Sequence, residues 1–231
     1  VDPHKRLDLY VDEWGTWYDR APGAPTALYQ QNTIRDAVSA ALFFHIFHDH
    51  ADRITMGNIA QVVNVLQAMI LTRDDRMLLT PTYHVFEMYK VHQGAKRIPL
   101  KVESPIYECA TADVPPAKPS DSFKADASPD KPWTNRVNAI SASASLAKGG
   151  EINVSLVNAS PTESYPVELT FAAKKSIAVN GRVLSAKRLD AHNTFDEPEI
   201  VKPRPLSVLK SSANTIAFSL PPASVSTVVA R

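Results

Sequence analysis

The chain has 231 residues, of which 44% are hydrophobic, so it is long enough to bury the core of one large domain or two smaller ones. Its 25 Lys and Arg residues nearly balance its 24 Asp and Glu residues, which disfavours a polyanionic partner such as nucleic acid. No apolar run approaches the about 20 residues that a membrane span requires, so we expect no membrane partner either.

The single cysteine, Cys109, excludes an internal disulfide in this chain and leaves the redox compartment undecided. No Cys-His motif surrounds it, so we interpret it as structural. The sequence opens without Met and almost directly in a predicted strand, so we expect the gene product to begin upstream. Periplasmic, secreted and cytoplasmic locations all stay open.

Residues 1–95 predict the order strand, helix, strand, helix. The alternating run at 7–11 ends in "DEWG", and "NTIRDAVSAALFFHIFHDHADR" (32–53) repeats apolar residues such as Ile34, Val38, Leu42 and Ile46 at helical spacing. "ITMGNIAQVVNVL" then indicates a buried strand that ends near residues 58–61.

The second helix has start and stop signals of its own. In "TPTYHVFEMYKVHQG", Thr80 can cap the helix, Pro81 suits its first turn and Gly94 can end it. Alternating strands and helices imply a parallel sheet, whose functional residues lie at the carboxyl ends of the strands.

The length of this first part is too short for a complete barrel. An eight-unit β/α barrel takes about 250 residues, so 95 residues supply only two or three units. Two parallel strands do not form a stable sheet with both faces covered. This part is therefore either a small appendage to the domain that follows or the carboxyl-terminal piece of a larger barrel.

Residues 96–231 predict an antiparallel β-sandwich. Strand-like runs follow one another, with Gly149-Gly150 and Asn180-Gly181 interpreted as turns: "RIPLKVE", "NAISASASLA", "EINVSLVNA", "YPVELTFA", "SIAVNGRVLSA", "NTIAFSL" and "SVSTVVA". The Ser alternation in "ISASAS" is interpreted as the solvent-facing side of a strand. Residues from about 110 to 133, rich in Pro, Ala, Ser, Asp and Lys, predict a long surface loop of disordered type.

The cluster "HIFHDH" invites a metal interpretation through His45, His48, Asp49 and His50. Metal-binding His pairs on helices more often use a spacing of four than the three seen here, and His50 points away from both, so we favour a structural role and expect no metal. The turn "AHNTFD" (191–196) is likewise interpreted as structural.

Several long blocks together resemble the carboxyl-terminal portion of bacterial α-L-arabinofuranosidases of glycoside hydrolase family 51. These blocks are "VDEWGTWYD", "YQQNTIRDAVSAALFFHIFHDHADRITMGNIAQVVNVLQAMILT", "MLLTPTYHVFEMYKVHQGA", "VNGRVLSA" and "LDAHNTFDEPEIVKP". The resemblance implies the last two units of a (β/α)8 barrel at 1–95 and a jelly-roll type sandwich at 96–231. It also implies release of terminal arabinofuranose from hemicellulose or oligosaccharides with retention, without a cofactor, and allows a homo-oligomer of the complete enzyme.

The resemblance assigns three residues to the sugar site. Glu13 matches the nucleophile at the end of barrel strand seven, Trp17 matches an aromatic bordering the sugar subsite, and Gln61 matches a glutamine that reaches the arabinose from strand eight. The family's acid/base glutamate, which follows an asparagine, belongs to strand four. We expect that strand to lie outside this chain, which alone should be inactive.

The residues agree with a role for Glu13 in retaining hydrolysis, which needs two carboxyl groups about 5 to 5.5 Å apart. Glu13 shares the parity of Leu7, Leu9 and Val11, whereas Asp12 points the other way; Trp14 and Trp17 are expected to form apolar walls. As the acid, Glu87, Glu103 and Glu108 are poor candidates, because none follows Asn at a strand end.

Two alternatives stay open. The chain could be a noncatalytic sugar-binding or structural sandwich module, which coplanar exposed aromatics would support; its β region offers Tyr107, Trp133, Tyr165, Phe171, Phe195 and Phe218. The enzyme could also act on related β-xylosides or β-glucans.

Overall fold

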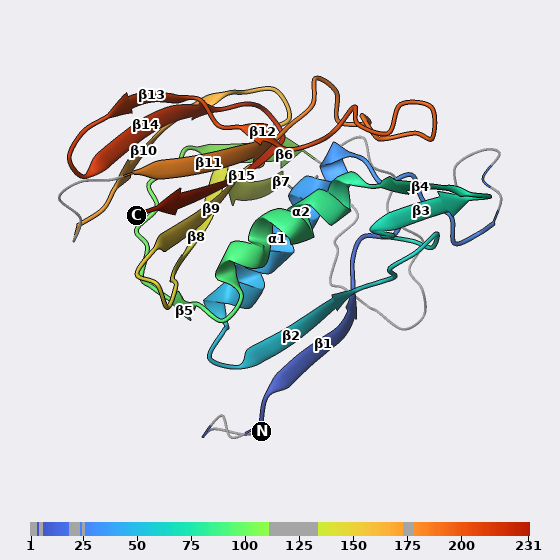
Figure 1. Cartoon of the computed structure of the whole chain (residues 1–231), viewed down its shortest axis with the longest axis horizontal. Coiled ribbons are helices and arrows are strands. Elements are labelled where there is room, and N and C mark those ends of the chain that lie inside the picture. The colour runs from blue at the N-terminus through green and yellow to red at the C-terminus, as the bar shows by residue number, and fades with distance from the viewer. Residues whose placement is uncertain (1–3, 5–6, 19–23, 25, 111–133, 173–177) are drawn as a thin grey trace.

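The computed structural model describes residues 4, 7–18, 24, 26–110, 134–172 and 178–231. Two helices lie between a small parallel sheet and a β-sandwich (Figure 1). The predicted architecture of β/α units followed by an antiparallel sandwich is confirmed. Most of the loop predicted at about 110–133 lies outside the described residues.

The parallel sheet consists of β1 (Leu9–Trp14) and β2 (Ile54–Ile59), joined through helix α1 (Ile34–Asp49). The register pairs Val11 with Gly57 and Trp14 with Ile59, and shifts between them. The predicted positions of the two strands and their parallel pairing are therefore confirmed, but β2 is not the buried strand that was expected, because only Ile59 in it is buried. The irregular stretch falls on Asp12 and Glu13.

Helix α1 begins with a cap that involves a buried acid. Asp36 Oδ2 accepts hydrogen bonds from the Thr33 backbone N–H at 2.8 Å and from its hydroxyl at 2.9 Å. Three of the buried residues of this helix are alanines, namely Ala37, Ala40 and Ala41. Ile46, expected on the apolar face, is 53% exposed.

A hairpin that the sequence did not predict precedes the second helix. It consists of β3 (Ile70–Arg73) and β4 (Arg76–Leu79). Helix α2 (Pro81–Tyr89) then continues into a short 3-10 helix, η1 (Lys90–His92). Thr80 accepts a hydrogen bond from the Tyr83 N–H, and Gly94 has φ +65°, which confirms the predicted start and stop signals.

The sandwich contains a six-stranded and a three-stranded antiparallel sheet. The larger sheet has the order β12 (Arg204–Pro205), β11 (Val179–Leu184), β15 (Ser224–Ala230), β9 (Ile152–Asn158), β8 (Ile140–Leu146) and β5 (Lys96–Arg97). The smaller has the order β10 (Tyr165–Thr170), β14 (Thr215–Leu220) and β13 (Val208–Ser211). Strands β6 (Ile106–Ala110) and β7 (Thr134–Asn138) pair separately.

One of the two predicted glycine turns is wrong. Gly149-Gly150 does separate β8 from β9, with Gly150 at φ +87°. Asn180 and Gly181 instead lie inside β11, paired with Val229 and Val228 of β15. The glycine is required there by close packing, because an added Cβ at Gly181 would lie 2.9 Å from the Cβ of Leu206.

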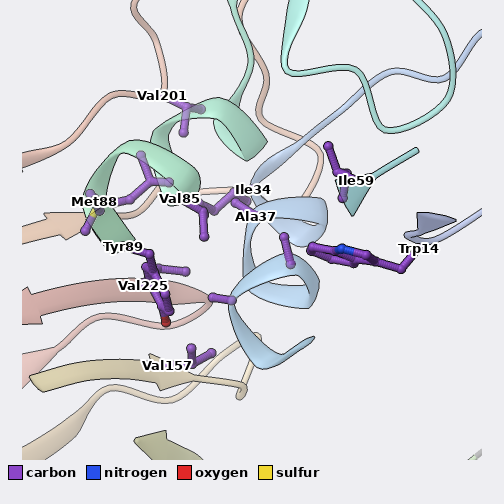
Figure 2. Close-up of a cluster of buried hydrophobic side chains, with 13 residues drawn as sticks. Trp14, Ile34, Ala37, Ile59, Val85, Met88, Tyr89, Val157, Val201 and Val225 are labelled. Atoms are coloured by element: carbon purple, nitrogen blue, oxygen red, sulfur yellow. The ribbon is translucent and has the colours of Figure 1, made fainter. Parts of the chain in front are cut away.

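Two main cores hold the molecule together. One lies between the two sandwich sheets and includes Phe171, Phe218 and Val228. The other surrounds α1, with Trp14 and Ile59 on the side of the parallel sheet and Val157 and Val225 on the side of the sandwich (Figure 2). This second core joins residues from both sides of the domain boundary predicted at residue 96, which stays a prediction.

The serines of "ISASAS" do not face solvent as predicted. Ser141, Ser143 and Ser145 face the helices, and their hydroxyls are hydrogen-bonded to Nδ1 of His45, His48 and His92, respectively, at 2.7 to 2.9 Å. Nε2 of His45 lies 3.0 Å from Ser155 Oγ and 2.9 Å from the Tyr89 hydroxyl. We call these residues the histidine–serine interface.

Burial governs the ionisation of these histidines. Burial, aided by the neighbouring His48 and His92, lowers the pKa of His45 to about 3. Burial also lowers the pKa of His92 to about 3, and it lowers that of His48. Neutral His45 and His48 thus serve packing between a helix and a sheet, in agreement with the structural role preferred for "HIFHDH".

Candidate active site

The carboxyl ends of β1 and β2 lie side by side. The backbone N–H of Ala60 donates to the carbonyl of Trp14 at 2.9 Å, just after the paired residues Trp14 and Ile59. Glu13 precedes this contact on β1, and Gln61 follows it after β2; both side chains are exposed. Two of the predicted site residues therefore lie at the same edge of the parallel pair, where parallel sheets carry their functional groups.

The two tryptophans of "EWGTW" have opposite surroundings. Trp17 is 66% exposed, so it is not a core residue. Trp14 is only 7% exposed, and its ring lies 5.2 to 6.1 Å from those of Phe43, Phe44, Phe47 and Phe86. The expectation that Trp14 forms a wall of the sugar site is wrong, because its indole packs against α1 and α2.

Gln30 holds the backbone on both sides of Trp17. Its side-chain oxygen accepts a hydrogen bond from the Tyr18 N–H at 2.7 Å, and its Nε2 donates to the Thr16 carbonyl at 3.0 Å. The guanidinium of Arg35 lies 3.7 Å from the centre of the Tyr18 ring, which adds a cation–π contact. The exposed indole thus extends from an anchored backbone.

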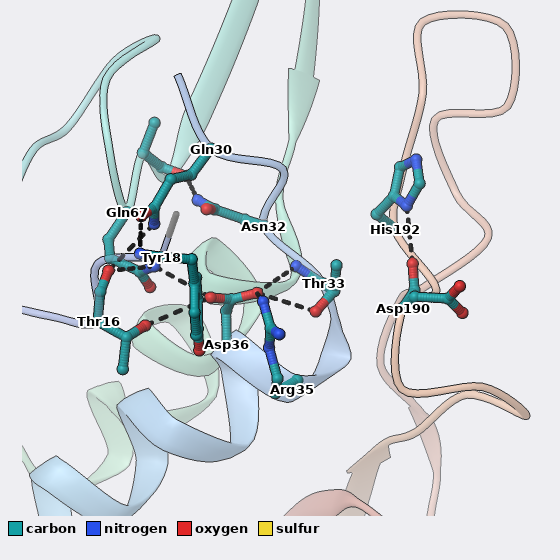
Figure 3. A network of polar contacts seen from close by, with 11 residues as sticks. Thr16, Tyr18, Gln30, Asn32, Thr33, Arg35, Asp36, Gln67, Asp190 and His192 are labelled. Atoms are coloured by element: carbon teal, nitrogen blue, oxygen red, sulfur yellow. Dashed lines mark hydrogen bonds and ion pairs between the residues drawn. The ribbon is translucent and has the colours of Figure 1, made fainter. Parts of the chain in front are cut away.

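Gln67 and Asp36 form hydrogen bonds to Thr16, in the same loop, from the buried side of the molecule (Figure 3). Gln67, 2% exposed, donates from Nε2 to the Thr16 carbonyl and to Asp36 Oδ1, both at 3.0 Å. Asp36 is fully buried and also accepts from the Thr16 hydroxyl at 3.4 Å. The segments that follow β1 and β2 are therefore tied to the start of α1.

Sequence reasoning did not identify this buried cluster of Gln30, Asp36 and Gln67. The pattern Thr33-x-x-Asp36 is a visible capping signal, but it does not indicate that the acid also reaches Thr16 and Gln67. Gln30 and Gln67 carry no local signal, because their partners lie 12 to 51 residues away along the chain.

The three weak candidates for a catalytic acid are paired elsewhere. Glu87 of α2 lies 2.6 Å from Arg182 of β11, Glu103 pairs with Lys101, and Glu108 pairs with Arg136. The hydrogen bond from Arg182 lowers the pKa of Glu87, which is the opposite of what a proton donor at neutral pH requires.

The sandwich aromatics do not favour a separate sugar-binding face. Phe171 and Phe218 are 6% and 1% exposed, and Tyr165 packs against the same core. Phe195 lies beneath the guanidinium groups of Arg73 and Arg76. Trp133 lies outside the described residues.

Within the described ranges, no group of three or more His, Cys, Asp or Glu side chains could hold a metal ion. The helices of that same part of the chain are all too short or too polar to cross a membrane.

In "AHNTFD", the buried Asn193 donates to the carbonyls of Leu79 and Val201 and accepts from the Val201 N–H.

Comparison with known proteins gives a consistent result. The family described as "Alpha-L-arabinofuranosidase C-terminal domain" matches residues 12–224. An intracellular exo-α-L-arabinofuranosidase of Bacteroides ovatus is 41% identical over 229 residues, which is 98% of this chain and 40% of that protein.

Solved structures agree with this match. The arabinofuranosidase of family 51 from Xanthomonas axonopodis pv. citri superposes with a TM-score of 0.83 at 38% identity, over 100% of this chain and 42% of that one. The arabinose complex of the Thermotoga maritima α-L-arabinofuranosidase, at 20% identity, shares the fold with a TM-score of 0.75 over 96% of this chain and 42% of that one. The chain thus spans about two fifths of the length of these relatives. It belongs to the α-L-arabinofuranosidases of glycoside hydrolase family 51 and corresponds to their carboxyl-terminal portion.

Proposed function

We propose that the complete protein containing this chain hydrolyses terminal non-reducing α-L-arabinofuranosides with retention, and that Glu13 is the nucleophile. The observation that carries the proposal is the exposed Glu13 at the carboxyl edge of the β1–β2 pair, in a chain of this family. Substrates would be arabinose-containing hemicellulose or the oligosaccharides derived from it.

In the first step, the Glu13 carboxylate attacks the anomeric carbon of the arabinofuranose and forms a glycosyl ester. The bond to the leaving oxygen breaks while a carboxylic acid donates a proton to it. In the second step, water attacks the anomeric carbon and gives a proton to the carboxylate that the acid became in the first step; the bond from this carbon to Glu13 breaks, which releases arabinose and the free Glu13 carboxylate. We assign the acid to a residue outside this chain.

Trp17 and Gln61 are proposed to bind the sugar. An exposed indole can pack against sugar C–H groups, and a glutamine amide can both donate to and accept from hydroxyls. Both residues belong to segments that leave the carboxyl ends of β1 and β2, beside Glu13.

The test compares Glu13→Ala with Asp12→Asn in the complete protein. Loss of a covalent nucleophile should lower kcat by several orders of magnitude, and azide should restore turnover in Glu13→Ala by replacing the missing carboxylate. Asp12→Asn removes the neighbouring carboxylate, to which we assign no part in the chemical step, and should keep most activity. Full turnover by Glu13→Ala would refute the proposal.

The substrate class needs a separate measurement. We expect 4-nitrophenyl α-L-arabinofuranoside to be cleaved at a higher kcat/KM than 4-nitrophenyl β-D-xyloside or β-D-glucoside. A 2-fluoro arabinofuranosyl inhibitor with a good leaving group should label the peptide that contains Glu13, as judged by mass spectrometry. Label on another residue would contradict the role of Glu13.

A further inference from the structure

The loop from Gly15 to Tyr18 connects the proposed nucleophile to the exposed Trp17. Three buried polar side chains, none of which reaches the exposed edge itself, hold its backbone: Gln30, Asp36 and Gln67 are 8%, 0% and 2% exposed. Burying amide and carboxylate groups is costly unless they are hydrogen-bonded. Their hydrogen bonds therefore restrain the backbone of this loop.

Gln67 acts closest to Glu13. Both hydrogens of its amide are used, one on the Thr16 carbonyl and one on Asp36 Oδ1. Its aliphatic stem lies against Gly15, because an added Cβ there would be 2.7 Å from the Cγ of Gln67. Gly15 also has φ +148°, a conformation that side chains rarely adopt, so the backbone two residues after Glu13 rests directly on Gln67.

Asp36 fixes Gln67 in turn. Its Oδ2 is held by Thr33 at the start of α1, which leaves Oδ1 to accept from Gln67 and from the Thr16 hydroxyl. A network whose members satisfy one another restricts each side chain to one rotamer. The helix start thus sets the position of the Gln67 amide.

Gln30 acts on the other end of the loop. Its single amide binds the Thr16 carbonyl and the Tyr18 N–H, the two peptide groups that flank Trp17. Rotation of the Trp17 backbone would break one or both of these bonds. The direction in which the indole extends therefore depends on Gln30.

We propose that Gln67, supported by Asp36, is a positioning residue for Glu13, and that Gln30 is a positioning residue for Trp17. The inference rests on the proposed function and adds to it a division of roles between two buried glutamines. Because a small displacement of a reacting group is costly to rate, loss of Gln67 should affect the chemical step. Loss of Gln30 should affect sugar binding.

The experiment replaces each amide by an apolar side chain of similar size in the complete protein. For Gln67→Met we expect kcat to fall between about 10- and 100-fold with a small change in KM. For Gln30→Met we expect KM to rise about tenfold while kcat stays within about threefold. Concentrations are corrected to the folded fraction by circular dichroism.

The matched control is Asn193→Leu. Asn193 is 2% exposed and makes three hydrogen bonds to the backbones of Leu79 and Val201, none of them to the loop from Gly15 to Tyr18. Its loss should lower the melting temperature comparably but leave kcat and KM of the folded enzyme unchanged. If Gln67→Met does not fold, Asp36→Asn tests the same support with less change in shape, and a lower kcat is again expected.

The outcomes separate the two proposals. If Glu13→Ala is inactive but the Gln67, Asp36 and Gln30 variants keep kcat and KM within about twofold of the Asn193→Leu values, the positioning roles are wrong and the proposed function stands. The same conclusion follows if the Gln30 and Gln67 variants do not differ in how their effect is divided between kcat and KM. Full activity of Glu13→Ala would overturn the proposed function instead.

Discussion

Trp14 and Trp17 lie three residues apart, yet Trp14 is 7% exposed and Trp17 is 66% exposed. Between them, Gly15 adopts φ +148°, which lets the chain leave the strand and turn the second indole outward. Trp14 fills the space among four phenylalanine rings, whereas Trp17 is available to a ligand. One short motif thus supplies both a core residue and a surface residue.

The first prediction concerns these two indoles. Trp14→Ala should lower the free energy of unfolding by about 3–5 kcal/mol, because it leaves a cavity between β1 and the helices. Trp17→Ala should change it by less than about 0.5 kcal/mol, since an exposed side chain loses little burial. Urea unfolding of this chain, followed by circular dichroism, measures both. Equal effects would contradict the separate roles.

At the scale of elements, the histidine–serine interface joins α1 and η1 to β8 and β9. Serine hydroxyls are short and can both donate and accept, so each can hydrogen-bond a nitrogen of a neutral imidazole without holding the layers apart. The same geometry disfavours the charged form of the rings. We therefore expect protonation of these rings to weaken the packing of the helices on the sandwich.

The second prediction is that acid weakens the fold through this interface. His45 and His92 have pKa values of about 3 when folded, and an unperturbed histidine has a pKa near 6.5. Between these values the unfolded chain binds more protons, so the free energy of unfolding falls as pH drops from about 6.5 towards 3. For His45 alone the loss at pH 5 is about 2 kcal/mol.

The test measures unfolding free energies by urea titration between pH 7 and pH 4. His45→Gln removes one titrating group and should reduce the dependence on pH, even though it also weakens the fold at pH 7. His50→Gln, at an exposed position beyond the helix end, serves as the control and should leave the dependence unchanged. An unchanged pH dependence in His45→Gln would refute the contribution of this ring.

At the scale of the whole molecule, strand β15 contributes to both main cores. Val225 packs into the core around α1, and Val228 packs between the two sandwich sheets; both are fully buried. They lie three residues apart on one strand, so their side chains point to opposite faces. Strand β15 thus packs against the helices on one face and against the three-stranded sheet on the other.

The third prediction uses these valines as a matched pair. Val225→Ala should accelerate amide hydrogen exchange mainly in α1, and Val228→Ala mainly in β10 and β14, at a similar cost of about 2 kcal/mol each. Hydrogen exchange read by mass spectrometry on peptides of this chain distinguishes them. Identical patterns of exchange for the two variants would show that the cores do not respond separately.

Much of the fold was predictable from local pattern. Thr80, Pro81 and Gly94 mark the second helix because capping and backbone restrictions act within a few residues. Prediction from the sequence failed where the role of a residue depends on a partner that is distant along the chain. Asn180-Gly181 resembles a turn but lies in β11, since Leu206 needs the space that a side chain would occupy.

The same distinction applies to the residues of the candidate site. Glu13, Trp17 and Gln61 were identified by resemblance of "VDEWGTWYD" and "NIAQ" to a family, and their roles stay predictions. Gln30, Asp36 and Gln67 were missed, because no local pattern distinguishes a buried amide from an exposed one.

Periodicity, caps and glycines act over a few residues, so the two helices and most of the strands could be predicted from the sequence alone, whereas the family was inferred from the resemblance of longer blocks of sequence. The partner of each polar side chain depends on which distant segments meet. Only the tertiary structure therefore established that the serines of "ISASAS" bind histidines, that Trp14 is buried, and that two glutamines hold the loop beside Glu13.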